Sequence, residues 1–346
     1  MRGSSPRMRQ ATLADVARLA GVSPATASRV LNGTGTRVAD ALRSRVLEAA
    51  EHLHYVPNAH AQALMRRANQ TVGVLAFNVS NPYFVEITSA IFGVATETGR
   101  LVTIAQTGAE RDNELSSIAL LRSQQVSAIV LAGSGRVDAE HNARVQAQLD
   151  VFRNAGGRAA VIGRHDLDVD AVVPDNVGGG EAAARALLDL GHVDVGIISG
   201  STQVTVTVDR LGGFCSVMAA AGRPVPAERI VEGAFLVESG AEAMAALLER
   251  APEVTAVYCI NDAMAIGALR LLRERGIEVP GRMSVMWFED IDMAKDVWLA
   301  LSTVHVPLRG LGETAMRLLL EPVGDEPRMV RLPTKLCLRG TTARQA

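Results

Sequence analysis

Residues 11–33 read ATLADVARLAGVSPATASRVLNG, and this stretch predicts two short helices joined by a tight turn. Thr12 and Asp15 have the spacing of a capping box, with aspartate in place of the usual glutamate or glutamine. Apolar residues then recur along one helical face until a glycine ends the helix. Ser23 is a good N-cap and Pro24 suits the first position of a second helix. The stretch therefore predicts a helix-turn-helix.

A third helix is expected after this pair. Ala27, Val30 and Leu31 give the second helix an inner face, and Asn32-Gly33 stops it. Further apolar positions then recur with helical spacing and close a three-helix core: they are Leu42, Val46, Leu47, Ala50 and Leu53.

The second helix has the residues of a DNA-reading helix that enters the major groove by its N-terminus. We expect Pro24 and Ala25 to face base edges, and Thr26 and Ser28 to bind phosphate oxygens. Arg29 forms either a bidentate pair with guanine or a phosphate contact. A small helical interaction module without nucleic acid is the alternative.

Charge is unevenly distributed along the chain. Residues 1–70 hold ten arginines and four acids, a balance of +6, whereas the remainder carries a balance of −8. A basic N-terminal segment, the basic head, on an acidic body indicates that the segment binds a polyanion, although a solvated basic surface is the simpler interpretation.

The stretch ATLADVARLAGVSPATASRVLNG, followed by HYVPNAHAQALMRR (residues 54–67), resembles the lactose-repressor (LacI/GalR) family of bacterial transcription regulators. The departures are small. Ala27 stands where valine is usual, and His54 where glycine is usual. Ala39 replaces a common serine cap, so the third helix should start less firmly.

The resemblance implies a hinge helix over residues 58–68, between a helix-turn-helix domain at 11–57 and a body at 70–346. A helix that short is marginal in water, so we expect it to fold on DNA. By resemblance Leu64 is a minor-groove wedge with Ala61 beside it, and ordinary core packing is the alternative for Leu64. The residues that we expect to contact DNA are Thr12, Ser23, Pro24, Ala25, Thr26, Ser28, Arg29, Asn32, Tyr55, Asn58, Ala61 and Leu64.

Short apolar runs alternate with helical stretches from Thr71 onward, which predicts an α/β body of doubly wound parallel sheets. The expected strands are 72–77, 101–105, 128–132, 159–162, 195–199, 255–260 and 284–288. The length favours two lobes, and the resemblance implies the periplasmic-binding-protein-like fold with three crossings between them. We expect the crossings near 190, 304 and 326, which gives lobe 1 residues 70–190 and 305–326, and lobe 2 residues 191–304 and 327–340.

Ligands of open parallel sheets bind beyond the carboxyl ends of the strands, and polar residues follow several of the expected strands. With aromatic residues that suit a sugar ring, they form the expected effector site: Asn78, Tyr83, Phe84, Arg164, Asp175, Arg210, Asn261, Trp287 and Glu289. Asp262 and Asp175 are also candidate helix caps, and Trp287 is also a candidate core residue.

The resemblance adds weight to Arg210, which lies in DRLGGF and matches an effector-binding arginine of the family. Where the family has Gly-Phe/Tyr-Asp-Asp, this chain has Trp287-Phe288-Glu289-Asp290, so we expect a pocket of different shape.

Several function classes are disfavoured. The sequence contains no Gly-x-Ser-x-Gly, His-Glu-x-x-His or Walker motif, so we expect no enzyme, cofactor or metal site. Gly178-Gly179-Gly180 lacks phosphate-loop spacing and predicts a closely packed helix start instead. Three scattered cysteines and no leader or membrane-spanning run favour the cytoplasm of a bacterium, with the regulator held on the nucleoid through its DNA.

Two hypotheses remain. The first is a DNA-binding regulator, a repressor, that binds a pseudo-palindromic operator as a homodimer and responds to a sugar or to a non-sugar effector. The second is a solute-binding protein of a transporter, which has no use for the basic head. The sequence leaves open whether the effector induces or co-represses, and whether the dimer pairs into a tetramer.

Overall fold

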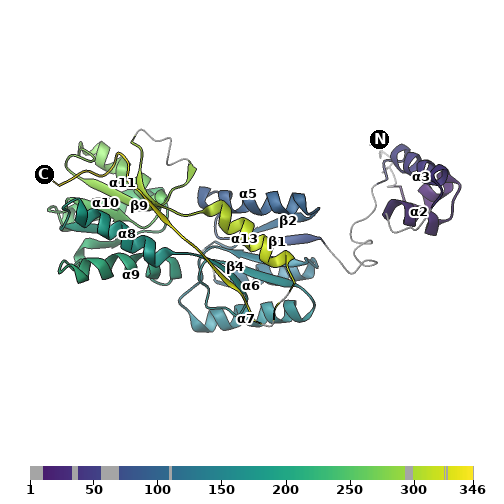
Figure 1. Cartoon of the computed structure of the whole chain (residues 1–346), viewed down its shortest axis with the longest axis horizontal. Helices are drawn as coiled ribbons and strands as arrows, with labels where there is room; N and C mark the ends of the chain where they lie inside the picture. The colour runs from purple at the N-terminus through teal and green to yellow at the C-terminus, as the bar shows by residue number, and fades with distance from the viewer. Residues whose placement is uncertain are drawn as a thin grey trace, which may run out of the picture. The chain divides into compact units, whose positions relative to one another are not determined.

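The computed structural model describes residues 11–32, 38–55, 70–108, 111–292, 299–322, 324 and 326–345. The chain forms two compact units, residues 1–69 and residues 70–346. Short helices make up the described part of the first unit, and the second contains both β-sheets (Figure 1).

The described residues of the N-terminal unit form three helices: α1 (Leu13–Ala20), α2 (Pro24–Asn32) and α3 (Asp40–His52). The predicted capping box is present, because Thr12 Oγ1 accepts from Asp15 N–H and Asp15 accepts from Thr12 N–H. Ser23 Oγ accepts from Thr26 N–H at the start of α2. No side chain caps α3 at Ala39, as its substitution for serine predicts.

The core of this unit is small and made largely of alanine and valine: its buried members are Val16, Ala17, Ala20, Ala27, Val46, Ala49 and Ala50. The predicted third stripe is wrong at Leu47, which is 48% exposed. Ala49 lies inside instead, because a helix face that includes Val46 and Ala50 continues through i+3 and not through i+1.

Two six-stranded sheets form the body, one in each lobe (Figure 1). The lobe 1 sheet has the order β11-β5-β4-β3-β1-β2, with bounds β1 Thr71–Ala76, β2 Leu101–Gln106, β3 Ala128–Ala132, β4 Arg158–Ile162, β5 Asp170–Pro174 and β11 Met329–Leu332. The lobe 2 sheet has the order β12-β10-β9-β8-β6-β7, with bounds β6 Val195–Ser199, β7 Ile230–Glu232, β8 Ala256–Cys259, β9 Ser284–Glu289, β10 Ser302–His305 and β12 Lys335–Cys337.

All pairings are parallel except that of β12 with β10, so the predicted doubly wound parallel sheets are confirmed. The seven expected strands are all present. Strands β5, β7, β10, β11 and β12 were not among the expected strands, and all of them except the five-residue β5 have at most four residues.

Helices cover both faces of each sheet. In lobe 1, α5 packs with α13 on one face and α6 with α7 on the other; their bounds are α5 Pro82–Glu97, α6 Arg111–Ser123, α7 Ala139–Asn154 and α13 Leu308–Leu320. In lobe 2, α8 packs with α9 and α10 with α11; their bounds are α8 Asn176–Asp189, α9 Thr205–Ala220, α10 Val237–Arg250 and α11 Asp262–Glu274, and a short 3₁₀ helix η1, Ala227–Arg229, precedes β7.

The structure corrects two of the three predicted crossings between lobes. Helix α8 packs on α9 and on lobe 2 strands, so the chain crosses directly after β5, at 174–175, and not near 190. Strand β11 pairs with β5 in lobe 1, which moves the last crossing from 326 to 333–334. The middle crossing, at 306–307, lies close to the predicted 304. Short, half-exposed β11 has too little apolar signal to be assigned from sequence.

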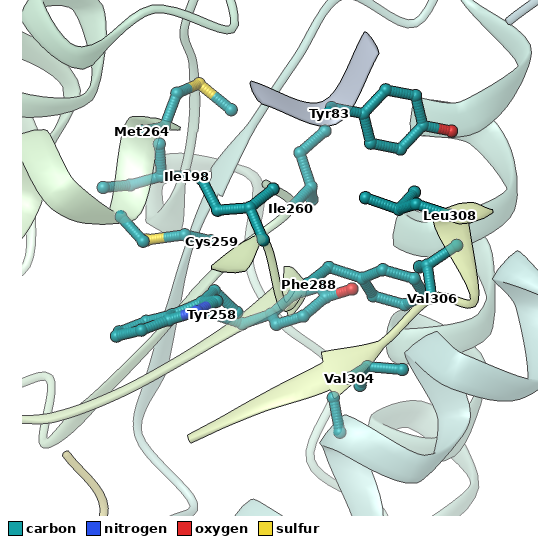
Figure 2. Packing of buried hydrophobic residues seen from close by; sticks show 14 of the residues in the cluster. Tyr83, Ile198, Tyr258, Cys259, Ile260, Met264, Phe288, Val304, Val306 and Leu308 are labelled. Carbon is teal, nitrogen blue, oxygen red and sulfur yellow. The ribbon is translucent and has the colours of Figure 1, made fainter. Parts of the chain in front are cut away.

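One hydrophobic core continues through the crossing segments. Figure 2 shows Tyr83 of α5 above Leu308 of α13, with Val306 next to the ring of Phe288 from β9. These residues belong to a single buried cluster that includes both lobes. The lobes are therefore packed together at the crossings.

Candidate functional site

A cavity of about 850 Å³ lies between the two lobes. Its walls come from the segments after β1, β2, β3 and β4 of lobe 1, and after β6, β7, β8 and β9 of lobe 2. This is the position expected for a ligand of parallel sheets, and the volume lies in the range of small-molecule sites.

Six of the nine predicted effector residues line this cavity: Asn78, Tyr83, Phe84, Arg210, Asn261 and Glu289. Asn78 follows β1, and the two aromatic residues lie in the first turn of α5. Arg210 lies in the second turn of α9. Asn261 follows β8, and Glu289 ends β9.

Arg210 is the centre of a buried polar network, with only 1% of its surface exposed. Its Nε donates to Asn176 Oδ1 at 3.0 Å. Its Nη1 donates to the Ile260 carbonyl at 2.6 Å and to Glu289 Oε1 at 3.1 Å. The guanidinium also lies over the Phe288 ring, 4.1 Å from its centroid, as a cation–π pair. The side chain is thus held in one orientation before any ligand arrives.

The remaining nitrogen of this guanidinium, Nη2, is buried and has no hydrogen-bond partner in the structure. A buried donor without a partner is costly, by about 1–3 kcal/mol. Because Arg210 lines the cavity, a ligand oxygen that accepts from Nη2 removes this cost. The geometry therefore leaves Arg210 one unused nitrogen, Nη2, whose two N–H groups are without a partner.

Glu289 carries the negative charge that faces Arg210, and only 7% of its surface is exposed. Burial raises the pKa of this carboxyl above its usual value, although the charge of Arg210 opposes the shift. Its backbone φ of 115° is in the left-handed region, which a residue other than glycine adopts only under strain. Such strain is typical of functional positions, since the surrounding structure must compensate for it.

Asn261, and not Asp262, caps α11: its Oδ1 accepts from Met264 N–H at 3.0 Å. The interpretation of Asp262 as the cap is therefore wrong. Asp262 is fully buried and accepts from Ile291 N–H at 2.7 Å. Burial, and then the charge of Glu289, raise the pKa of Asp262 well above its usual range. Of the two neighbouring carboxyls, those of Asp262 and Glu289, the carboxyl of Asp262 therefore holds its proton more firmly.

The cavity has an extensive apolar wall. Tyr83 and Phe84 meet edge to face with centroids 5.1 Å apart, and burial raises the pKa of Tyr83 to about 12. Phe77 of lobe 1 and Leu236 of lobe 2 also line the cavity, although 39% and 48% of their surfaces are exposed. Apolar groups with this much exposure lose contact with water when a ligand occupies the space beside them.

Three predicted effector residues are not among the described residues that line the cavity: Arg164, Asp175 and Trp287. Arg164 pairs with Asp209, and this hydrogen bond raises its pKa. Asp175 accepts from Gly178 N–H as the cap of α8, the alternative that its position before a helix suggested. Trp287 is completely buried in the core, because β9 is an inner strand whose two faces are both covered.

Sequence reasoning missed several polar residues of the cavity. Ser134 and Arg136 follow β3, and Ser201 and Gln203 follow β6. The rule that found Asn78 would have found all four, because they follow runs that the sequence already predicts as strands. Glu114 and Asn142 belong to helices and gave no such signal.

Helix α2 of the N-terminal unit presents the predicted DNA-reading side chains outward. Pro24, Ala25 and Arg29 are exposed, Thr26 and Ser28 are half-buried, and Ala27 faces the core. Thr12 is exposed, and Tyr55 packs partly against the core. Asn32 ends α2. Asn58, Ala61, Leu64 and the rest of the predicted hinge helix lie outside the described residues.

Neither metal chemistry nor a membrane span is indicated within the described ranges. No group of three or more His, Cys, Asp or Glu side chains there is arranged to hold a metal ion. No helix in these ranges is both long and apolar enough to cross a membrane. The three cysteines are free thiols.

Comparison with protein families gives two matches. "Bacterial regulatory proteins, lacI family" matches residues 12–58, and "Periplasmic binding proteins and sugar binding domain of LacI family" matches residues 69–339.

Curated relatives and solved structures extend over nearly the whole chain. The HTH-type transcriptional repressor PurR of Escherichia coli O1:K1 / APEC is 32% identical over 96% of this chain and 97% of its own length. The ribose operon repressor of Haemophilus influenzae is 31% identical, with coverage of 90% and 92%. A transcriptional regulator CelR–cellobiose complex matches with a TM-score of 0.71 and 31% identity, over 96% of this chain and 99% of that one. The lac repressor dimer bound to operator and the anti-inducer ONPF matches with a TM-score of 0.87 and 25% identity, over 97% and 100%.

Proposed function

The chain belongs to the LacI family of bacterial regulatory proteins and is a DNA-binding transcriptional regulator, and from this premise we propose that a neutral, hydroxyl-rich effector controls it. In this proposal a sugar or sugar derivative binds between the lobes and sets the affinity of a cytoplasmic homodimer for a pseudo-palindromic operator.

The paired charge of Arg210 carries the proposal of a neutral effector. Glu289 already balances the guanidinium, so an anionic ligand finds no uncompensated positive charge there. What remains is the nitrogen Nη2 with its two N–H groups, which suit hydroxyl or ring oxygens. Asn261 and Asn78, which also line the cavity, have amide N–H groups for further ligand oxygens.

The apolar wall favours an effector with a nonpolar face or substituent. This wall is the observation that supports a non-sugar effector as the second candidate. A sugar ring has such a face, and the aromatic side chains at the mouth of the cavity suit it. The two candidates differ in the number of oxygens that the ligand presents. A panel that varies hydroxyl content at constant size separates them.

For DNA binding, the support is the exposed N-terminal half of α2 together with the +6 balance of residues 1–70. A phosphate backbone attracts such a surface, and the exposed Arg29, in the last turn of α2, suits a base edge or a phosphate. The other hypothesis, a solute-binding protein of a transporter, leaves the N-terminal unit without a role.

The homodimer rests on an apolar surface of lobe 1. Strand β2 lies at the edge of its sheet, and its apolar residues Leu101 and Ile104 are exposed, at 69% and 36%. Val85 and Phe92 of α5, which contacts β2, are also exposed, at 46% and 42%. A soluble protein seldom leaves a sheet edge and a neighbouring apolar helix face uncovered, so a second copy is the expected partner.

The test has a DNA arm and a ligand arm, both with the full chain. Selection from random-sequence DNA, followed by gel-shift titration, should yield a two-fold symmetric site bound as a dimer. Thermal shifts should then be measured with cellobiose and ribose, the sugars that occur in the names of related proteins, and with gluconate and glucose 6-phosphate as anionic sugars.

A neutral ligand at about 100 times its dissociation constant adds roughly 2.7 kcal/mol of stability. We expect this stabilisation from a neutral sugar and not from gluconate or glucose 6-phosphate. We also expect Arg210→Ala to abolish the thermal shift, and Arg185→Ala, on the exposed face of α8, to leave it in place. Failure to recover any DNA would contradict the regulator, and stabilisation by the anionic ligands alone would contradict the neutral effector.

A further inference from the structure

The two lobes meet in a second place, across the cavity from the crossing segments. Residues 135–137 of lobe 1, after β3, lie against residues 203–205 of lobe 2, at the start of α9. Thr205 N–H donates to the Gly135 carbonyl at 3.0 Å, and Val137 N–H donates to the Gln203 carbonyl at 2.9 Å. These two bonds enclose the antiparallel pair Arg136 and Val204. We call residues 135–137 and 203–205 the interlobe bridge.

Arg164 holds the bridge from the lobe 1 side. Its carbonyl accepts from Thr205 Oγ1 at 2.6 Å and from Gly135 N–H at 3.0 Å. Its guanidinium forms a bidentate pair with Asp209 of α9, at 3.2 Å from Nε and 2.9 Å from Nη2. Bidentate arginine–carboxylate pairs fix geometry as well as energy. Arg164 therefore fastens the first turns of α9 to lobe 1 through both its backbone and its side chain.

The Arg164–Asp209 pair is shielded enough from solvent to contribute to the contact between the lobes. The Asp209 side chain is 16% exposed and that of Arg164 is 34% exposed, whereas fully exposed pairs contribute little. Asp166 adds a second carboxylate at 3.3 Å from Nη1, but it is half exposed. Thr205 is almost completely buried, so its two bonds across the lobes are protected from water.

Asp209 directly precedes Arg210 on α9. One residue therefore ties α9 to lobe 1 across the cleft, and the next offers its unused Nη2 donor to the cavity. A movement of α9 that improves the contact of Arg210 with a ligand must alter the Arg164–Asp209 distance. The bridge and the cavity are thus mechanically coupled through a single helical turn.

We propose that the Arg164–Asp209 pair and the interlobe bridge form a latch that sets the equilibrium between lobe arrangements in the ligand-free protein. Neither Arg164 nor Asp209 lines the cavity or belongs to the DNA-reading helix, yet the latch biases the arrangement of the lobes on which both effector and operator depend. Its consequence for operator affinity rests on the proposed function, whereas its existence does not.

The experiment measures amide hydrogen exchange with residue resolution in the full, ligand-free chain. Thr205 and Val137 N–H report the bridge, and Gly163 N–H, bonded to the Val172 carbonyl within lobe 1, is the internal control. The variants are Arg164→Gln, Asp209→Asn and the double variant.

We expect exchange of both bridge amides to accelerate about fivefold in each single variant, which corresponds to about 1 kcal/mol at 1.4 kcal/mol per tenfold. The double variant should exchange no faster than either single variant, because the second change removes a partner that is already lost. Gly163 should be unaffected.

Arg229→Gln is the matched control, since Arg229 also bridges two carboxylates, Asp194 and Glu253, but within lobe 2. It should leave the bridge amides at wild-type rates. Operator affinity on the selected DNA should change in Arg164→Gln and Asp209→Asn in the same direction, and not in Arg229→Gln.

Wild-type exchange at Thr205 and Val137 in the two latch variants would overturn the proposal, as would faster exchange with unchanged operator affinity. Failure of the proposed function is a different result, in which the wild-type chain selects no DNA while the exchange pattern of the latch persists.

Discussion

Replacing Arg210 by methionine should destabilise the body by about 3–5 kcal/mol at pH 7.5, because the change leaves a buried carboxylate without its partner. In the wild-type protein the guanidinium satisfies Glu289, the Ile260 carbonyl and Asn176. Methionine keeps much of the volume and the contact with Phe288, so the loss is mainly electrostatic. Domains of ordinary stability, about 5–15 kcal/mol, tolerate this loss and remain folded.

The loss should depend on pH, and its sign follows from Glu289. Burial already raises the pKa of this carboxyl in the folded protein, and removal of Arg210, the group that lowers it, raises it further. A folded state that holds the proton more tightly than the unfolded state becomes less stable as pH rises from the unfolded pKa to the folded pKa. The destabilisation by Arg210→Met should therefore be smaller at pH 5 than at pH 7.5.

A double variant separates charge from packing. Arg210→Met combined with Glu289→Gln removes both charges, and a neutral buried pair is often as stable as the ion pair that it replaces. We expect the double variant to recover most of the loss and to show little extra pH dependence. Glu289→Gln alone should cost less than Arg210→Met, because its amide oxygen still accepts from Arg210 Nη1.

Urea unfolding followed by tryptophan fluorescence is a suitable assay, since both tryptophans belong to residues 70–346 and the signal reports the body. The four proteins are compared at pH 5 and 7.5. An equal loss at both pH values, or a double variant that loses the sum of the single variants, would refute a charge-pair role for Arg210.

Three shorter predictions follow from other positions. Arg29→Ala should weaken binding to the selected operator by about 1–3 kcal/mol in a gel-shift titration while the body unfolds as before, and unchanged affinity would remove Arg29 from DNA reading. Gly213→Ala should cost about 1–3 kcal/mol in urea unfolding, because its Cβ would lie 2.2 Å from the Val177 carbonyl. Its neighbour Gly212 has nothing within 4 Å, so Gly212→Ala should stabilise the protein by about 0.5–1 kcal/mol, and equal effects would contradict close helix packing. The Asp262→Asn variant should gain stability relative to wild type as pH rises from the ordinary aspartate pKa to the raised pKa of Asp262, by up to about 1.4 kcal/mol per pH unit. Parallel plots of unfolding free energy against pH for the two proteins would show that this carboxyl is ionised.

The sequence predicted the parts of the fold that depend on short-range patterns. The capping box at Thr12, the inner position of Ala27 and the long apolar strands all follow from local spacing, and the structure confirms them. The glycine run at the start of α8 was also interpreted correctly, since a Cβ at Gly180 would lie 2.3 Å from the Arg210 carbonyl. These features are specified within one or two helical turns.

The sequence could not predict features that depend on distant partners. Strand β11 has only four half-exposed residues, and its place in lobe 1 follows from pairing with β5, more than 150 positions earlier. Arg164 follows a strand and is polar, as a ligand contact should be, but Asp209 on the other lobe occupies its guanidinium. A rule based on strand ends finds the edge of the cavity and cannot distinguish side chains that face it from side chains that fasten the lobes.

Helix α9 shows why side chains that fasten the lobes matter for the control of the protein by a ligand. Its close contact with α8, with no room for side chains at Gly180 and Gly213, makes the two helices move as one body. Helix α8 begins at the first crossing, where Asp175 caps it, and Asn176 accepts from Arg210 Nε. A ligand that engages Arg210 therefore acts on a rigid pair of helices that is attached to lobe 1 at both ends, through the crossing and through the interlobe bridge. If the proposed effector binds here, we expect it to change one of these attachments and with it the relative position of the two lobes.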